Sequence, residues 1–139
     1  MRVEETVDIA AGPQEVWAVL ADVERWPIWT ASVSAVRLLT PAPLAVGSRV
    51  EVRQPRLPQA VWTVSALTPG RSFSWESTGP GVRSIGDHEI VPAGTGSRAT
   101  LRFTQTGPMS PVVGTLMSGL IRRYVRTEAA GLKVRCEQG

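Results

Sequence analysis

The chain has 139 residues, of which 42% are hydrophobic and 19% are charged, a composition typical of a globular protein with its own core. We therefore expect a single domain over residues 1–139. The one cysteine, Cys136, excludes an internal disulfide, and because neither a metal-ligating set nor a cofactor motif is present, we expect no metal and no cofactor. The sequence has no apolar run long enough for a membrane span and no signal-peptide pattern, so we expect a cytoplasmic protein.

The formal net charge of +3 raises the question of a nucleic-acid partner. The arginines are scattered along the chain, and only Arg122, Arg123 and Arg126 form a cluster. Because binding that neutralises phosphates needs a contiguous basic face, we expect no nucleic-acid partner. The cluster fits a solvated helix face, and a protein-interaction surface is the alternative.

The first thirty residues predict one strand followed by two short helices. Apolar and polar side chains alternate over residues 2–9, as in a half-buried strand. Pro13 suits the first turn of a helix, because an N–H group at that position would have no partner within the helix. Asp22 is expected to cap a second short helix that ends near Trp26 and Pro27.

Six further strands are expected in the middle of the chain, separated by short breaks rich in Pro and Gly. Apolar side chains recur there with a period of two, which is the strand period. The expected strands span residues 33–39, 49–53, 60–67, 71–78, 82–91 and 97–106. Connections this short make consecutive strands antiparallel neighbours.

The last segment, about residues 111–137, changes to the three- and four-residue spacing of an amphipathic helix. Only this helix is long enough to cover the apolar face of the sheet. The predicted fold class is therefore α+β, with the helix-grip arrangement. A curved seven-stranded antiparallel sheet wraps around the long C-terminal helix, and two short helices follow the first strand.

The same alternation predicts which side chains face this helix. In residues 82–91 the charged side chains occupy odd positions, which places His88, the only histidine, on the inner face. Small residues on that face, Ser84, Gly86 and Ala99, favour incomplete filling beneath the helix. We therefore expect a mostly apolar cavity with a few polar groups, which is the character of a small-molecule site.

Two expected strands also define an aromatic pair on this inner face. If residues 67–70 form a four-residue hairpin loop, Trp62 lies directly opposite Trp75, and Val64 lies opposite Phe73. Such aromatic side chains either fill the core or contact a ligand, and the pattern allows both readings.

Four polar residues near the inner face have a structural and a functional interpretation. His88 is either a satisfied core histidine or a general acid/base, because the ordinary imidazole pKa of about 6.5 suits proton transfer near neutral pH. Glu5 and Gln105 are either cavity groups or strand-end residues. Arg71, at a strand end, could polarise a ligand carbonyl.

The connections at 55–58, 79–81 and 107–111 are expected at one end of the sheet, where they would form the cavity rim, with Met109 as a flexible apolar lip. The residues expected to line the cavity are Val52, Trp62, Val64, Phe73, Trp75, His88, Ile90, Leu101, Phe103, Gln105, Met109, Met117 and Ile121.

Several stretches carry a family resemblance: residues 9–13, 16–17, 20, 26–29, 64, 69, 90–92, 96–99 and, in the last helix, Glu128, Leu132, Lys133 and Glu137. They resemble the START-like helix-grip superfamily (SRPBCC), in particular the bacterial polyketide cyclase/dehydrase family. The resemblance implies a deep cavity that binds lipids, sterols, polyketides or other apolar compounds. Some members of the family are aromatase/cyclases, whereas others are carriers or sensors.

Three functions follow as hypotheses. The first is a binding protein for a small hydrophobic molecule, which needs only the cavity. The alternative is a polyketide cyclase or dehydratase that uses His88 as general acid/base. The third is a protein-interaction module that uses the arginine cluster. The sequence does not specify the ligand or the oligomeric state.

Overall fold

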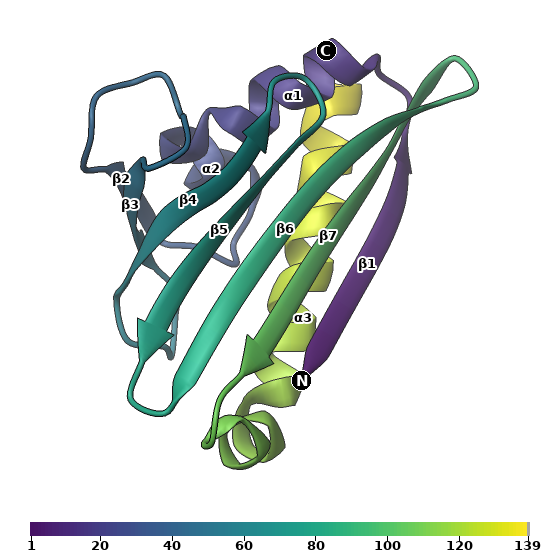
Figure 1. Cartoon of the computed structure of the whole chain (residues 1–139). Helices are drawn as coiled ribbons and strands as arrows, with labels where there is room; N and C mark the ends of the chain where they lie inside the picture. Colours follow the sequence, from purple (N-terminus) through teal and green to yellow (C-terminus); the bar gives the residue numbers. More distant parts are fainter. Residues whose placement is uncertain (139) are drawn as a thin grey trace.

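The computed structural model describes residues 1–138, and its elements follow the predicted order (Figure 1). Strand β1 is followed by helix α1, a 3₁₀ turn and helix α2, then by strands β2 to β7 and the long helix α3. The bounds are β1 Arg2–Ile9, α1 Pro13–Ala21, the 3₁₀ turn Val23–Arg25, α2 Trp26–Trp29, β2 Ala35–Leu38, β3 Arg49–Arg53, β4 Ala60–Thr68, β5 Ser72–Gly79, β6 Val82–Ala93, β7 Gly96–Thr106 and α3 Ser110–Glu137.

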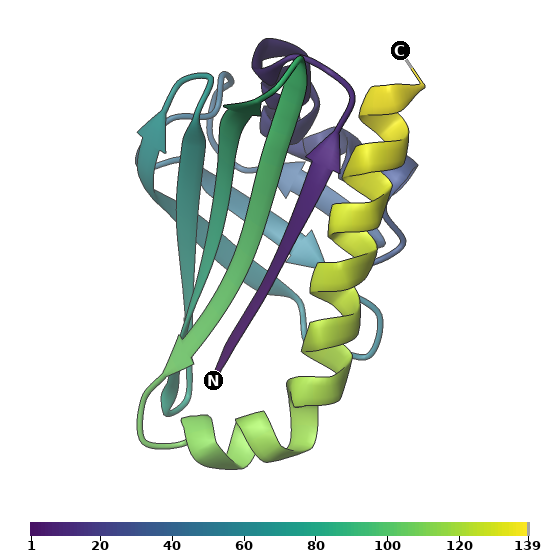
Figure 2. The same ribbon diagram turned by 90° about the vertical axis from the view of Figure 1, so that its right-hand side faces the viewer.

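The seven strands form one antiparallel sheet in the order β1-β7-β6-β5-β4-β3-β2. Consecutive strands from β2 to β7 are neighbours, as the short connections predict, and β1 closes the order by pairing with β7. The sheet curves around α3, which lies along its concave side (Figures 1 and 2). The predicted helix-grip fold is confirmed.

Strand alternation divides the sheet into an inner apolar face and an outer charged face. Inner residues such as Val50, Val64 and Leu101 are buried. On the outer face, Arg102 pairs with Glu4 at 2.7 Å. The inner face therefore provides the core and any cavity, while the charges of the strands face water.

Helices α1 and α2 close one end of the space between the sheet and α3 (Figure 1). The larger part of the core lies at this end and includes the fully buried Leu20 and Leu132. A smaller cluster fills the space between α3 and the β1–β7 edge, around Val3 and Val125. Dense packing at one end and along one edge leaves the remaining inner face for a cavity.

Helix α3 bends in its N-terminal third (Figure 2), a region that contains Gly114 and the pair Ser118–Gly119. Gly–Ser pairs are a common cause of such bends. The first turns of α3 therefore cross the end of the sheet, whereas the rest of the helix lies along it. Met117 is half-buried beneath the bend, and Leu116 is 76% exposed.

The predicted pairing of β4 with β5 is wrong by two positions before a β-bulge and by three positions after it. Val64, not Trp62, lies opposite Trp75, and Leu67, not Val64, lies opposite Phe73. The strands pair up to Thr68 and Ser72, so the hairpin loop is residues 69–71 instead of 67–70, and the bulge interrupts the register between Val64 and Ala66. The extra residue in a bulge shifts the side chains that follow it. The bulge also explains why Leu67 faces the core although the alternation before it predicts the outer face.

Other differences concern the ends of elements. Helix α2 continues through Pro27 to Trp29, because Pro27 occupies its first turn, where a missing N–H group is tolerated. Asp22 makes no side-chain capping hydrogen bond. Strand β2 covers residues 35–38 rather than 33–39, and β6 extends to Ala93.

Candidate functional site

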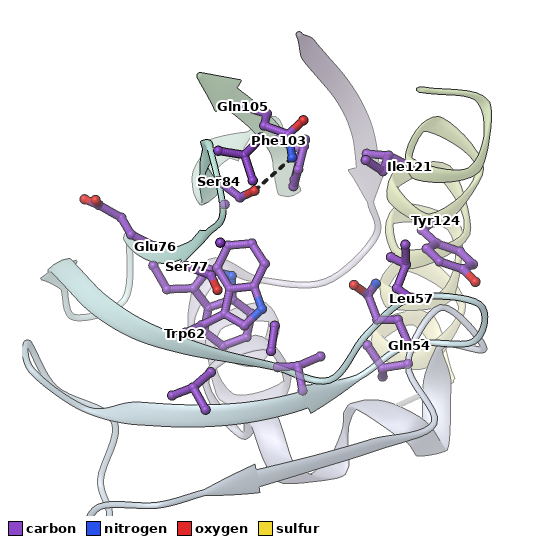
Figure 3. Close-up of a pocket in the computed structure, with 18 of the residues that line it drawn as sticks. Gln54, Leu57, Trp62, Glu76, Ser77, Ser84, Phe103, Gln105, Ile121 and Tyr124 are labelled. Atoms are coloured by element: carbon purple, nitrogen blue, oxygen red, sulfur yellow. Dashed lines mark hydrogen bonds between the residues drawn. The ribbon is translucent and has the colours of Figure 1, made fainter. Parts of the chain in front are cut away.

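A cavity of about 1030 Å³ lies between the concave face of the sheet and α3. Figure 3 shows Trp62, Ser84 and Phe103 on the sheet side, with Ile121 and Tyr124 of α3 across from them. Exposed residues such as Pro80 also belong to the lining, so the cavity reaches solvent. The sheet, α3 and the loops at one end of the sheet together form its walls.

The structure brings most of the predicted cavity residues together. Nine line the cavity: Val52, Trp62, Trp75, His88, Leu101, Phe103, Gln105, Met117 and Ile121. The other four predicted positions, Val64, Phe73, Ile90 and Met109, are not in its lining.

The four exceptions have a common cause, which is packing against another part of the chain. Val64, Phe73 and Ile90 are fully buried in the larger core cluster, and Phe73 meets the edge of Trp17 from α1 at 6.2 Å. Met109 is no lip, because it packs on Gly81, where an added Cβ atom would lie 2.3 Å from the Met109 Cγ.

The three connections predicted for the rim divide between two roles. Leu57 and Pro58 of the β3–β4 loop and Pro80 of the β5–β6 turn line the cavity. The β7–α3 connection instead packs on the β5–β6 turn, where the Met109 N–H donates to the Gly81 carbonyl at 2.9 Å. The β3–β4 loop is tied to α3 by a hydrogen bond from the Tyr124 hydroxyl to the Pro55 carbonyl.

Three indole rings form a continuous aromatic wall. Trp62 and Trp75 still meet as diagonal neighbours on β4 and β5, with ring centroids 5.8 Å apart, and Trp75 lies 5.3 Å from Trp26 of α2. Gly86 on the neighbouring strand makes room for this arrangement, because an added Cβ atom would lie 2.7 Å from the Trp75 Nε1. Trp26, which was not among the predicted cavity residues, also belongs to the cavity lining.

His88 is buried at the α2 end of this wall. Its ring stacks on Phe73 at 4.2 Å, and its Nδ1 lies 3.1 Å from the Phe73 carbonyl. A carbonyl only accepts hydrogen bonds, so Nδ1 carries the proton and a neutral ring presents the Nε2 lone pair. Burial lowers the pKa of His88 to about 4, which keeps the imidazole neutral near pH 7 and makes it a weaker base than its ordinary pKa implies.

Glu128 of α3 faces His88, and sequence reasoning did not select it as a site residue. Its Oε1 lies 3.7 Å from the His88 Nε2, which is longer than a normal hydrogen bond. Burial raises the pKa of Glu128 to about 8, so the pair is a carboxylic acid facing a neutral imidazole near pH 7. The sequence feature that could have identified Glu128 is its position between Val125 and Leu132, where an acidic residue interrupts the apolar stripe of the last helix.

Gln105 and Ser84 form a second polar point in the cavity lining. The Gln105 Nε2 donates to the Ser84 Oγ at 3.2 Å, as the dashed line in Figure 3 marks. Gln105 is only 7% exposed, and its Oε1 has no hydrogen-bond partner in the part of the chain that the structure describes. Of the two interpretations left open by the sequence, the structure places Gln105 in the cavity wall.

The remaining polar candidates lie outside the cavity lining. Glu5 faces α3 and pairs with Arg126 at 3.5 Å, whereas Arg71 is exposed at the turn before β5. Arg122 and Arg123 lie on the exposed face of α3. None of these residues belongs to the lining of the cavity between the sheet and the helix.

The described residues contain neither a candidate metal site nor a candidate membrane-spanning helix. Residues 1–138 contain no group of three or more His, Cys, Asp or Glu side chains that could hold a metal ion. Within the same residues, no helix combines the length and the apolar character that crossing a membrane requires.

Comparisons with known proteins relate the chain to one family. The family described as polyketide cyclase/dehydrase and lipid transport matches residues 1–137. An uncharacterized protein of Mycobacterium tuberculosis, Rv2574, is 26% identical over 132 residues, which cover 87% of this chain and 78% of the relative.

Two solved structures share the fold at low sequence identity. The Zhui aromatase/cyclase from Streptomyces sp. R1128 has a TM-score of 0.75 and 20% identity, covering 99% of this chain and 94% of that one. A START superfamily protein from Mycobacterium smegmatis has a TM-score of 0.80 and 17% identity, covering 99% and 97%. At these identities the likeness establishes the fold.

Proposed function

This chain belongs to the polyketide cyclase/dehydrase and lipid transport family, and from this premise we propose that it binds a small hydrophobic molecule, such as a lipid or polyketide, between the sheet and α3. The observation that carries the proposal is the cavity of about 1030 Å³ walled by three indole rings. Its volume lies at the upper end of the roughly 300–1,000 Å³ typical of small-molecule sites.

The character of the wall supports an apolar ligand. Trp62, Trp75 and Phe103 offer flat apolar faces, and Met117 and Ile121 offer flexible and branched aliphatic surfaces from α3. Burying apolar ligand surface contributes about 25 cal/mol per Å². A ligand that fills part of this cavity can therefore bind through surface burial alone.

The test uses N-phenyl-1-naphthylamine, an uncharged probe whose fluorescence rises in apolar surroundings, with binding measured by calorimetry as well. Met117→Trp places an additional indole ring in the cavity and is expected to weaken binding at least about tenfold, because the space for the probe is lost. Leu116→Trp adds the same ring one residue away on the exposed face of α3 and is expected to leave binding unchanged. Equal affinities in the wild type and both variants, or no binding to the wild type, would contradict the proposal.

A second function, a cyclase or dehydratase, is favoured by one observation, the facing acid and imidazole of Glu128 and His88. In the dehydration of a β-hydroxy ketone, the His88 Nε2 takes the proton next to the carbonyl, and the Glu128 carboxylic acid gives its proton to the departing hydroxyl. The C–O bond breaks, a C=C bond forms and water leaves. Transfer of the proton from His88 to Glu128 then restores both groups.

This second function is tested with 4-hydroxy-4-phenylbutan-2-one, whose dehydration to 4-phenylbut-3-en-2-one is followed by ultraviolet absorbance. Glu128→Gln and His88→Ala are each expected to lower the rate about 10²–10⁴-fold, while binding of N-phenyl-1-naphthylamine changes no more than a few-fold. Turnover that persists unchanged in both variants, or no turnover by the wild type, leaves the binding function and removes the catalytic one.

A further inference from the structure

One buried amide in the cavity wall is left partly unsatisfied by the protein. Gln105 has two N–H donors and one carbonyl acceptor on its side chain. Within residues 1–138, its only side-chain hydrogen bond joins Nε2 to the Ser84 Oγ at 3.2 Å. Turning the amide over would pair its oxygen with the Ser84 hydroxyl and leave the nitrogen without a partner instead. Either orientation leaves a buried polar atom at the cavity.

Hydrogen bonds anchor the main chain that carries the Gln105 side chain. The Gln105 carbonyl accepts from the Ser110 hydroxyl at 2.9 Å and from the amino group of Met1 at 3.1 Å, and its N–H donates to the Met1 carbonyl at 2.9 Å. Buried polar groups usually have a hydrogen-bond partner, and an unsatisfied one costs free energy. Gln105 lines the cavity and has one buried amide atom without a partner, so its side chain is suited to receive a hydrogen bond from a ligand.

The rest of the inner wall determines the charge of that ligand. Among residues 1–138, the arginines in the cavity lining are Arg49 and Arg102, and strand alternation places both on the outer face, where Arg102 pairs with Glu4. The inner wall thus offers no cationic side chain to neutralise a ligand carboxylate, and the Met1 amino group, which donates to the Gln105 carbonyl, is outside the cavity lining. The other polar groups of the cavity are His88 and Glu128. Burial lowers the pKa of His88 and raises the pKa of Glu128, so both side chains are held in their neutral forms. An uncompensated charge in such surroundings is costly.

From this geometry we infer that the cavity selects an uncharged apolar ligand carrying a hydroxyl group, and that Gln105 and Ser84 form the subsite for that hydroxyl. A hydroxyl both donates and accepts, so it satisfies the Gln105 amide in either orientation. Ser84 and His88 are four residues apart on one strand, or about 13 Å, so the hydroxyl lies well away from the Glu128–His88 pair. This inference rests on the proposed ligand-binding function.

The experiment compares three probes of one shape, naphthalene, 2-naphthol and 2-naphthoate, by equilibrium dialysis. The wild type is expected to bind 2-naphthol about 2- to 10-fold more tightly than naphthalene, the gain of one neutral hydrogen bond, and 2-naphthoate at least about tenfold more weakly than 2-naphthol. Gln105→Met keeps the length of the side chain and removes the amide. In this variant the preference for 2-naphthol is expected to disappear, while naphthalene affinity is retained and so reports an intact fold and cavity.

Matched variants assign the subsite. Thr104→Val, on the outer face of the same strand, is expected to keep the wild-type preference. Equal binding of naphthalene and 2-naphthol by the wild type, tight binding of 2-naphthoate, or a preference that survives in Gln105→Met but is lost in Glu128→Gln would overturn the inference and leave the cavity as a binding site. Failure of the wild type to bind any of the three probes would instead overturn the proposed function itself.

Discussion

Glu128 and His88 change protonation in opposite directions when the chain folds. Burial raises the pKa of Glu128 from 4.5 to about 8 and lowers that of His88 from 6.5 to about 4. The stabilising contribution of Glu128 is complete below pH 4.5 and is lost as the pH rises through 8, whereas that of His88 is complete above pH 6.5 and is lost as the pH falls through 4. Between pH 4.5 and 6.5 the two dependences offset each other.

Above pH 6.5, of these two residues only Glu128 makes the free energy of unfolding depend on pH. This gives a prediction for the wild type. Between pH 6.5 and 8 the free energy of unfolding is expected to fall by about 2 kcal/mol from this residue, because only the unfolded chain has released the proton. Glu128→Gln cannot titrate and is expected to remove this fall. Urea unfolding followed by tryptophan fluorescence across this pH range measures it.

Glu89→Gln, exposed on the strand that carries His88, is the control and is expected to keep the wild-type fall. Identical pH dependence in the wild type and Glu128→Gln would mean that the Glu128 carboxyl is not held protonated by burial. The assignment of Glu128 and His88 as a neutral acid facing a neutral imidazole would then be wrong.

The inward orientation of His88 could be predicted from the sequence, whereas the contact of Glu128 with it could not. The odd-position charges of β6 predicted the inward orientation of His88, which the structure bears out with a 5% exposed side chain. Glu128 was visible only as an acid on an apolar helical stripe. The partner that it faces depends on how α3 is rotated against the sheet, and helical periodicity alone does not fix that rotation.

At the scale of the elements, the type and order of strands and helices could be predicted, because short connections and clear periods leave few alternatives. The register of β4 and β5 could not, because the strands extend to Thr68 and Ser72 around a shorter loop than predicted, and a bulge adds one residue to β4. Leu67, an apolar residue at an outward position, was the local sign of that bulge. The continuation of α2 through Pro27 was missed because proline both ends helices and suits their first turn.

The contact between α3 and α2 depends on one glycine. At Gly131 an added Cβ atom would lie 2.1 Å from the Trp29 carbonyl oxygen, so backbone rather than a flexible side chain would have to move. Gly131→Ala is therefore expected to lower the free energy of unfolding by about 1–3 kcal/mol. Urea denaturation measures the change.

Gly119→Ala provides the matched control in the same helix, because no atom lies within 4 Å of its added Cβ. Alanine has the higher helix propensity, so this variant is expected to gain up to about 1 kcal/mol. If Gly131→Ala were as stable as Gly119→Ala, the close packing of α3 on α2 would be incorrect.

Across the whole molecule, strand parity identifies the face of a residue but not its distance from the helices that close the end of the sheet. Seven of the predicted strand residues line the cavity, and Met117 and Ile121 of α3 complete the nine. Val64, Phe73 and Ile90 have the same parity as their neighbours on the strands but are fully buried, whereas Trp62 and Trp75 belong to the same core cluster and still line the cavity. The division between core and cavity is thus a property of curvature and of the placement of α1 and α2, which the linear pattern does not encode.

The five tryptophans allow the most direct test of ligand binding between the sheet and α3. Trp26, Trp62 and Trp75 line the cavity, whereas Trp17 and Trp29 do not. In a ¹⁵N-labelled sample, titration with 2-naphthol is expected to shift the indole N–H signals of the first three to saturation and to leave the other two nearly unchanged. Unchanged signals from all five, or shifts confined to Trp17 and Trp29, would contradict a ligand site in this cavity.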